Sequence, residues 1–252
     1  MFSYLNHLCL IKFYGEQKLK TIGMLGGMSW ESTASYYKAI NEGVNNKLGG
    51  LNSAKICLYN VNFDEIEKLQ HQEKWNDTAK ILSNAAKSVE AGGADFLIIC
   101  TNTMHKVASE IQSEISIPIL HIADATATKL VADGIKRVGL LGTRFTMEQD
   151  FYKSRLVNSF SIDVIVPNRD DQTIIHNVIY DELCRGVINN NSRDKYLRII
   201  DDLYAEGAEA IILGCTEIAL LINQKDTEVP LYDTTEIHAA QAVKLALIDD
   251  LT

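Results

Sequence analysis

The chain has 252 residues, of which 46% are hydrophobic and 23% are charged, and its formal net charge at pH 7 is -9. This composition is typical of a globular protein long enough to bury one large core or two smaller ones. The acidic excess argues against nucleic acid or an anionic membrane surface as the main partner. No apolar run approaches the roughly 18 residues needed to cross a bilayer. Small molecules remain as candidate ligands, including anionic ones, because a local positive site can outweigh the overall charge.

Residues 1–18 precede the first predicted strand and lack the pattern of a secretory signal. His7 and Lys12 flank only four apolar residues, and no small-residue cleavage site follows. We therefore interpret residues 1–18 as an N-terminal extension and expect a cytoplasmic location.

The five cysteines do not form a recognisable framework. Their number is odd, no CxxC motif is present, and no His/Cys cluster has zinc spacing; they are Cys9, Cys57, Cys100, Cys184 and Cys215. The pattern predicts neither structural disulfides nor a metal site.

The first half of the chain alternates short aliphatic runs with longer helical segments. The run 21–27 (TIGMLGG) ends in glycines and predicts a buried parallel strand that enters a tight turn. Ser29 or Ser32 can cap the helix that follows, which the pair Gly49-Gly50 ends. Further strands are predicted over 54–63, 95–103 and 117–124, and further helices over 75–94 and 104–116. The second half repeats this order, with strands over 137–142, 162–167, 210–216 and 229–233.

The two halves are related in sequence. The stretch GADFLIICTNT (93–103) aligns with GAEAIILGCTE (207–217), which places Cys215 opposite Thr101 and not opposite its neighbour Cys100. Three further matches follow in the same order at offsets of 112 to 116 residues: Lys20 with Lys136, Tyr37-Lys38 with Tyr152-Lys153, and Pro118 with Pro230. We interpret the chain as two halves of similar build.

Alternating strands and helices in two related halves predict an α/β fold with two similar Rossmann-like domains. We expect their parallel sheets to be related by a pseudo-twofold axis, with the active site in the cleft between them. The first domain is predicted over 19–118 plus 232–252 and the second over 119–231. Ligands bind beyond the carboxyl ends of parallel strands, and the segments 26–28, 101–103, 142–143 and 215–217 all lie at such ends.

Cys215 is the candidate nucleophile. It precedes TEIALLI, a predicted helix with Thr216 as cap, and a helix N-terminus favours the thiolate. A buried structural cysteine is an equally common reading of such a position. The repeat favours a role in the cleft because it brings both turns to one site.

Thr101 occupies the matching turn, where its hydroxyl can cap a helix, bind substrate or carry a proton. Successive strand side chains point to opposite faces, so Cys100 should pack into the domain if Thr101 faces the cleft. The glycine turn after the first strand lacks both GxGxxG and GK[ST], which makes a nucleotide site a weak reading. His105, four residues after Thr101, is either structural or orients a cleft group.

Several motifs resemble the aspartate/glutamate racemase family, which includes hydantoin racemases. They are IGMLGGMSWEST, CTNTMHK, HIADAT, LLGTRFTMEQDFY and GCTEIALL, and the resemblance extends from Lys20 to about Ala246. It implies a cofactor-independent amino-acid racemase, without pyridoxal phosphate or metal, that acts as a homodimer. In such enzymes two cysteines flank the substrate α-carbon; one removes the proton and the other replaces it from the opposite face.

Carried over residue by residue, the second-half cysteine of the family is Cys215, whereas the first-half cysteine falls on Thr101. A branch of the family that resembles this sequence carries this Thr/Cys pair and prefers L-aspartate and L-glutamate. The resemblance also implies a set of substrate-binding residues: Met28, Gln70, Asn102, Thr103, Thr216 and Glu217. Our hypothesis is that Cys215 abstracts the α-proton of the L-substrate and Thr101 delivers one to the opposite face.

Two alternatives remain at this point. A decarboxylase-type relative would protonate an enediolate from a single thiol, and a non-catalytic amino-acid-binding protein would keep the cleft without turnover. A second substrate carboxylate would favour an arginine or lysine in the cleft, whereas the stretch carried over as substrate-binding reads Gln70-His71-Gln72.

Overall fold

The structure is a computed structural model that describes residues 19–247, so the predicted extension 1–18 lies outside the described residues. No helix among them is long and apolar enough to cross a membrane. The first half contains β1 (Ile22–Gly26), α1 (Trp30–Leu48), β2 (Ile56–Asn60), α2 (Phe63–His71), α3 (Trp75–Ala91), β3 (Phe96–Ile99), the short helix η1 (Thr103–Val107) and α4 (Ala108–Gln112). The second half contains α5 (Ile122–Ala132), β4 (Arg137–Gly142), α6 (Arg144–Glu148), α7 (Asp150–Phe160), β5 (Asp163–Ile165), α8 (Arg169–Asn177), η2 (Val178–Glu182), η3 (Leu183–Arg185), α9 (Asn190–Ala205), β6 (Ala210–Gly214), α10 (Ile218–Leu221), β7 (Leu231–Asp233) and α11 (Thr234–Ala246).

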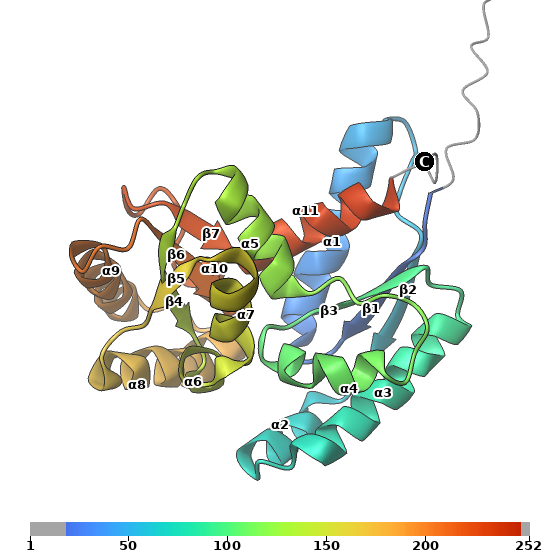
Figure 1. Cartoon of the computed structure of the whole chain (residues 1–252), viewed down its shortest axis with the longest axis horizontal. Coiled ribbons are helices and arrows are strands. Elements are labelled where there is room, and N and C mark those ends of the chain that lie inside the picture. The colour runs from blue at the N-terminus through green and yellow to red at the C-terminus, as the bar shows by residue number, and fades with distance from the viewer. Residues whose placement is uncertain (1–18, 248–252) are drawn as a thin grey trace, which may run out of the picture.

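The two halves build two parallel sheets with the same strand order. The first sheet runs β2-β1-β3 and the second β5-β4-β6-β7. Ile119 forms a single parallel bridge with Leu97 of β3, at the place that β7 occupies beside β6. Figure 1 shows the sheets in separate lobes. The predicted α/β fold with two similar Rossmann-like domains is confirmed, although the strand expected over 117–124 is reduced to this bridge.

Helices cover both faces of each sheet, which is why the central strands are apolar along their whole length. In the first sheet, Leu25 of β1 packs with residues of α3 and α4, while Ile22 and Met24 pack against α1 and α11. In the second sheet, Leu141 of β4 packs towards α8 and α9, and Leu140 packs towards α5 and α7. The carboxyl ends of the strands therefore stay open for a site.

The last helix, α11, returns to the first half of the chain. It contacts α1 and α5, and Lys20 N–H donates to Ala246 O at 3.0 Å (Figure 1). β7 pairs with β6 up to Asp233, so the domain boundary expected at residue 231 falls inside this strand. The division of the chain into two domains at these residues stays a prediction.

The turn after β1 brings α1 to the cleft. Gly27 has φ 92°, and a Cβ at this position would collide with the backbone oxygen of Val61. Ser29 then caps α1, since its hydroxyl accepts from Ser32 N–H at 3.3 Å. Glycine in this turn lets Met28 and Ser29 reach the pocket described next.

Candidate active site

One pocket lies where the carboxyl ends of both sheets meet, and it encloses about 450 Å³ with its open mouth included. Its lining contains all eight residues predicted from the sequence: Met28, Gln70, Thr101, Asn102, Thr103, Cys215, Thr216 and Glu217. The structure thus brings the two matching turns of the repeat to one cavity.

Other lining residues were not predicted as site residues: Ser29, Phe63, Met104, Thr143, Ile179, Tyr180, Cys184 and Gly214. Thr143 carried a signal, because it follows a predicted strand at the same edge as Thr101. Phe63 lies on α2, and residues 179 to 184 lie on the irregular turns η2 and η3. None of the sequence matches between the halves covers these segments, so the repeat did not point to them.

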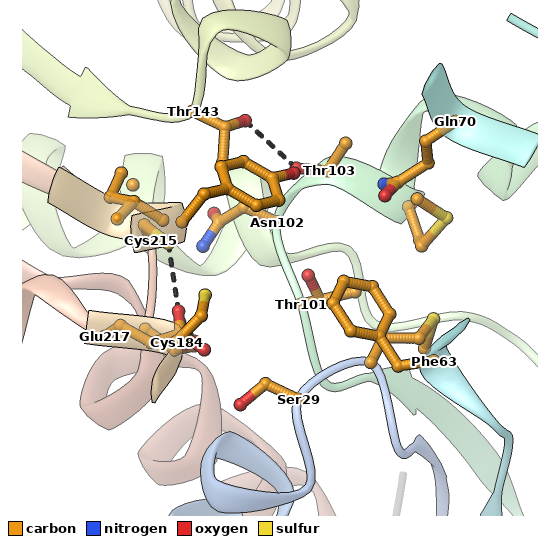
Figure 2. Close-up of a pocket in the computed structure, with 16 residues that line it drawn as sticks. Ser29, Phe63, Gln70, Thr101, Asn102, Thr103, Thr143, Cys184, Cys215 and Glu217 are labelled. Carbon is orange, nitrogen blue, oxygen red and sulfur yellow. Dashed lines mark hydrogen bonds between the residues drawn. The ribbon is translucent and has the colours of Figure 1, made fainter. Parts of the chain in front are cut away.

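The Cys215 thiol faces a buried carboxylate. Its Sγ–H donates to Glu217 Oε2 at 3.0 Å, and the Thr216 hydroxyl donates to the same oxygen at 2.7 Å (Figure 2). The Ser32 hydroxyl, from α1 of the first half, donates to Glu217 Oε1 at 2.9 Å and lies in close contact with the Thr216 hydroxyl. Glu217 is only 5% exposed. A group from each half therefore holds this carboxylate in place.

The prediction that Cys215 is held as a thiolate does not agree with this environment. Desolvation of the sulfur raises the pKa of Cys215 well above its usual value, and the charge of Glu217 raises it further. The helix after Cys215, α10, has only four residues, and its cap position is Glu217, without a side-chain cap bond. Thr216 is not the cap, because its hydroxyl donates to Glu217. The thiol is protonated in the ligand-free protein.

Thr101 is fixed through its backbone. Its carbonyl accepts from His105 Nδ1–H at 2.8 Å, and His105 Nε2 accepts from the N–H of Ile122 at 3.2 Å. Burial lowers the pKa of His105, so the ring is neutral, with its proton on Nδ1. Cys100 is fully buried in the core shared with α1 and α11, as predicted. The turn that carries Thr101 is thus fastened to the start of α5.

Two further contacts join the halves beside Thr101. The Asn102 amide donates to Thr234 Oγ1 at 3.0 Å, and the Thr234 hydroxyl donates to Leu213 O at 2.9 Å. The hydroxyls of Thr103 and Thr143 lie 3.2 Å apart. These bonds hold the first-half turn against the ends of β4 and β6.

The pocket has two unlike sides. Cys215 and Glu217 lie on one side and Gln70 and Phe63 on the other, with Thr101 between them (Figure 2). Among the lining residues that the structure describes, Glu217 is the one charged side chain. Across residues 19–247, no group of three or more His, Cys, Asp or Glu side chains is placed to hold a metal ion.

Comparisons with known proteins agree with this arrangement. Residues 25–242 match the family described as Asp/Glu/Hydantoin racemase. An Asp/Glu racemase candidate from Yersinia pestis, known from a crystal structure, is 52% identical, with a TM-score of 0.86 over 91% of this chain and 100% of its own. An aspartate racemase homologue from Pyrococcus horikoshii OT3 is 37% identical, with a TM-score of 0.79 over 90% of this chain and 99% of its own. The broad specificity amino-acid racemase RacX from Bacillus subtilis is 24% identical over 234 residues, which are 90% of this chain and 98% of RacX.

The family match and the likeness to racemases over nearly the whole chain identify an amino-acid racemase of the aspartate/glutamate type. The chain belongs to the Asp/Glu/Hydantoin racemase family. The predicted enzyme class is confirmed.

Proposed function

We propose that this protein racemises a free amino acid by proton transfer between two stations, Cys215 and Thr101, without a cofactor. The observation that carries the proposal is that these two side chains, from matching turns of the two halves, line one pocket. L-Aspartate, L-glutamate or a similar amino acid is the substrate that the sequence resemblance implies.

The first step needs a thiolate, and Glu217 is placed to generate it. The thiol proton moves from Cys215 Sγ to Glu217 Oε2 along the 3.0 Å hydrogen bond. The pair carries one negative charge before and after this transfer, so the ammonium group of a bound amino acid favours the thiolate when it lies closer to Sγ than to the Glu217 carboxylate. The thiolate then takes the α-proton of the substrate.

The second step returns a proton to the opposite face of the α-carbon. The Thr101 hydroxyl gives its proton to the carbanion while it receives one from solvent, and the proton removed from the substrate leaves to solvent from the Cys215 side, so no free alkoxide accumulates. Backbone N–H groups at the start of η1, near Asn102 and Thr103, have no acceptor within that helix and suit the α-carboxylate. Unequal stations should make the two directions of racemisation unequal.

The test is incorporation of solvent deuterium at the α-carbon, measured by proton NMR on a panel of L- and D-amino acids in deuterium oxide. The wild-type protein should exchange an L-amino acid, and Cys215→Ser should lower the rate by at least about 100-fold because the base is lost. Cys57→Ser serves as the matched control, since Cys57 lies on β2 outside the pocket lining.

Full exchange in Cys215→Ser would reject the assignment of the base. Binding of amino acids without exchange would identify a sensor, and carbon dioxide release from a substituted malonate would identify a decarboxylase. The homodimer and the cytoplasmic location stay predictions.

A further inference from the structure

The electrostatics of the pocket disfavour a second substrate carboxylate. The described lining holds the Glu217 carboxylate and no lysine or arginine. Two cations on neighbouring elements are engaged elsewhere: Lys106 Nζ donates to Gln149 Oε1 at 2.6 Å and lies 4.0 Å from the Trp75 ring, and Arg144 lies 3.8 Å from Glu148. A carboxylate taken from water into this pocket would lose its hydration next to another anion, without a compensating cation.

Gln70 presents a hydrogen-bonding group that the protein itself does not satisfy. Its side chain is 3% exposed, and its Oε1 is buried without a partner within residues 19–247. In Figure 2 the carboxamide points into the pocket from the side opposite Cys215. A buried acceptor of this kind lowers stability unless a ligand supplies a donor.

The surroundings of Gln70 are apolar. Met28 and Met104 line the pocket as part of the first-half core, and Phe63 packs against that core. A cationic side chain at this end would meet no carboxylate, since Glu217 lies on the other side. A purely apolar side chain would leave the Gln70 oxygen unpaired. An uncharged side chain with an amide or hydroxyl group needs no countercharge from the pocket, and it can donate a hydrogen bond to Gln70 Oε1.

We infer that the substrate has an uncharged, hydrogen-bonding side chain and that Gln70 recognises it, with Oε1 as acceptor and Nε2–H as donor. This inference rests on the proposed racemase function and narrows its substrate class. A carboxylate can accept from Gln70 but cannot donate to it. Sites built around a hydrogen bond discriminate strongly between near-isosteric substrates.

The test compares isosteric pairs in the deuterium exchange assay: L-asparagine with L-aspartate, and L-glutamine with L-glutamate. We expect the amide of at least one pair to exchange with a kcat/KM roughly 100-fold above that of its acid. Equal or faster exchange of the acid in both pairs would overturn the inference and leave the racemase intact. Fastest exchange of L-lysine or L-methionine would also overturn it.

If no amino acid exchanges, the proposed function fails, and calorimetric binding of the same pairs then decides the inference by itself. Tighter binding of an amide than of its acid supports recognition by Gln70. Tighter binding of both acids rejects it.

Substitutions at Gln70 give a second readout. Gln70→Lys should raise the ratio of acid to amide turnover by at least about tenfold, because it adds the missing cation. Gln72→Lys adds the same charge at an exposed position outside the pocket lining and should leave the ratio unchanged. Gln70→Leu, which adds no buried charge, should slow the amide substrates and raise the ratio of L-methionine to amide turnover. An unchanged ratio in a folded Gln70→Lys variant, or unchanged amide turnover in Gln70→Leu, would overturn the assignment.

Discussion

In the ligand-free protein the Cys215 thiol is protonated and donates to Glu217, although the proposed reaction needs the thiolate as a base. The carboxylate accepts from one thiol and two hydroxyls, and it is almost fully buried. Desolvation and the neighbouring charge both raise the pKa of the thiol. The ligand-free protein is therefore protected from unwanted thiolate chemistry, since the thiolate is the reactive form.

Glu217→Gln should separate reactivity from turnover. Removing the negative charge lowers the pKa of Cys215, so alkylation of this residue by iodoacetamide should reach half its maximal rate at a lower pH. Exchange of the α-proton should nevertheless fall by about 100-fold, because no carboxylate takes the thiol proton. Peptide mapping by mass spectrometry isolates the signal of Cys215 from the other cysteines. A turnover rate equal to wild type would mean that Glu217 only positions the thiol.

The internal repeat alone singles out Thr101 and Cys215, because sequence periodicity records which turns are equivalent. It contains no information on Phe63, Tyr180 or Cys184, because none of the sequence matches between the halves covers their segments. Ser32 was considered only as a helix cap, whereas its hydroxyl reaches Glu217 across the cleft. The sequence pattern predicts a lowered pKa for the Cys215 thiol, and this prediction is wrong. The pKa is raised by desolvation, which depends on tertiary burial and cannot be read from the sequence.

At the level of elements, the predicted strands and helices largely agree with the structure, since buried parallel strands and capped helices leave strong local patterns. The nine-residue helix α2 was not predicted, although it carries Gln70. It spans only nine residues, so its apolar face repeats over too few turns to identify a helix from the sequence.

The repeat also supplies a matched stability test at Gly23 of β1 and Gly139 of β4. A Cβ at Gly23 would lie 2.8 Å from the Phe96 backbone oxygen, whereas one at Gly139 would lie 2.5 Å from the terminal Cδ1 of Ile211. The backbone cannot move aside, but a side-chain end can. We expect Gly23→Ala to lower the free energy of unfolding by about 2–3 kcal/mol and Gly139→Ala by about 1 kcal/mol, as measured by urea denaturation. The reverse order would show that the second sheet is the more rigid one.

For the molecule as a whole, three buried histidines from different parts of the chain, His105, His121 and His238, lie close together. The His105 ring lies 4.5 Å from that of His121 and 5.9 Å from that of His238, measured between centroids. The His238 Nε2–H donates to Leu120 O, and its Nδ1 accepts from the Tyr36 hydroxyl. Burial lowers the pKa of His121 to about 3 and that of His238 to about 4, and it also lowers that of His105. All three rings are neutral at pH 7.

Stability should therefore decrease as the pH falls below about 6.5. Below this pH the three histidines bind protons in the unfolded chain but stay neutral in the folded protein. Each histidine therefore lowers the free energy of unfolding by up to about 1.4 kcal/mol per pH unit. Asp233 opposes them between about pH 6 and 3.8, because burial raises its pKa to about 6 and the folded state then binds the extra proton. Three histidines outweigh one aspartate. The urea concentration at the midpoint of unfolding should decrease as the pH is lowered from about 7.5 to about 5.

His121→Asn isolates one of the three contributions. Asparagine can accept from the Ala123 N–H, as His121 Nδ1 does at the start of α5, without titrating. The pH dependence of the unfolding free energy should then be shallower by roughly a third. A slope identical to that of the wild type would exclude His121 as a contributor.

The return of α11 to the first sheet has a consequence for biosynthesis. Ile22 and Met24, near the start of the chain, are covered in part by Ala239, Ala242 and Val243, near its end. While the ribosome is still making the second half, this face of the first sheet is covered by α1 but not by α11. That lobe can finish folding only when α11 is available, so the interval before then is when this protein most needs protection from aggregation.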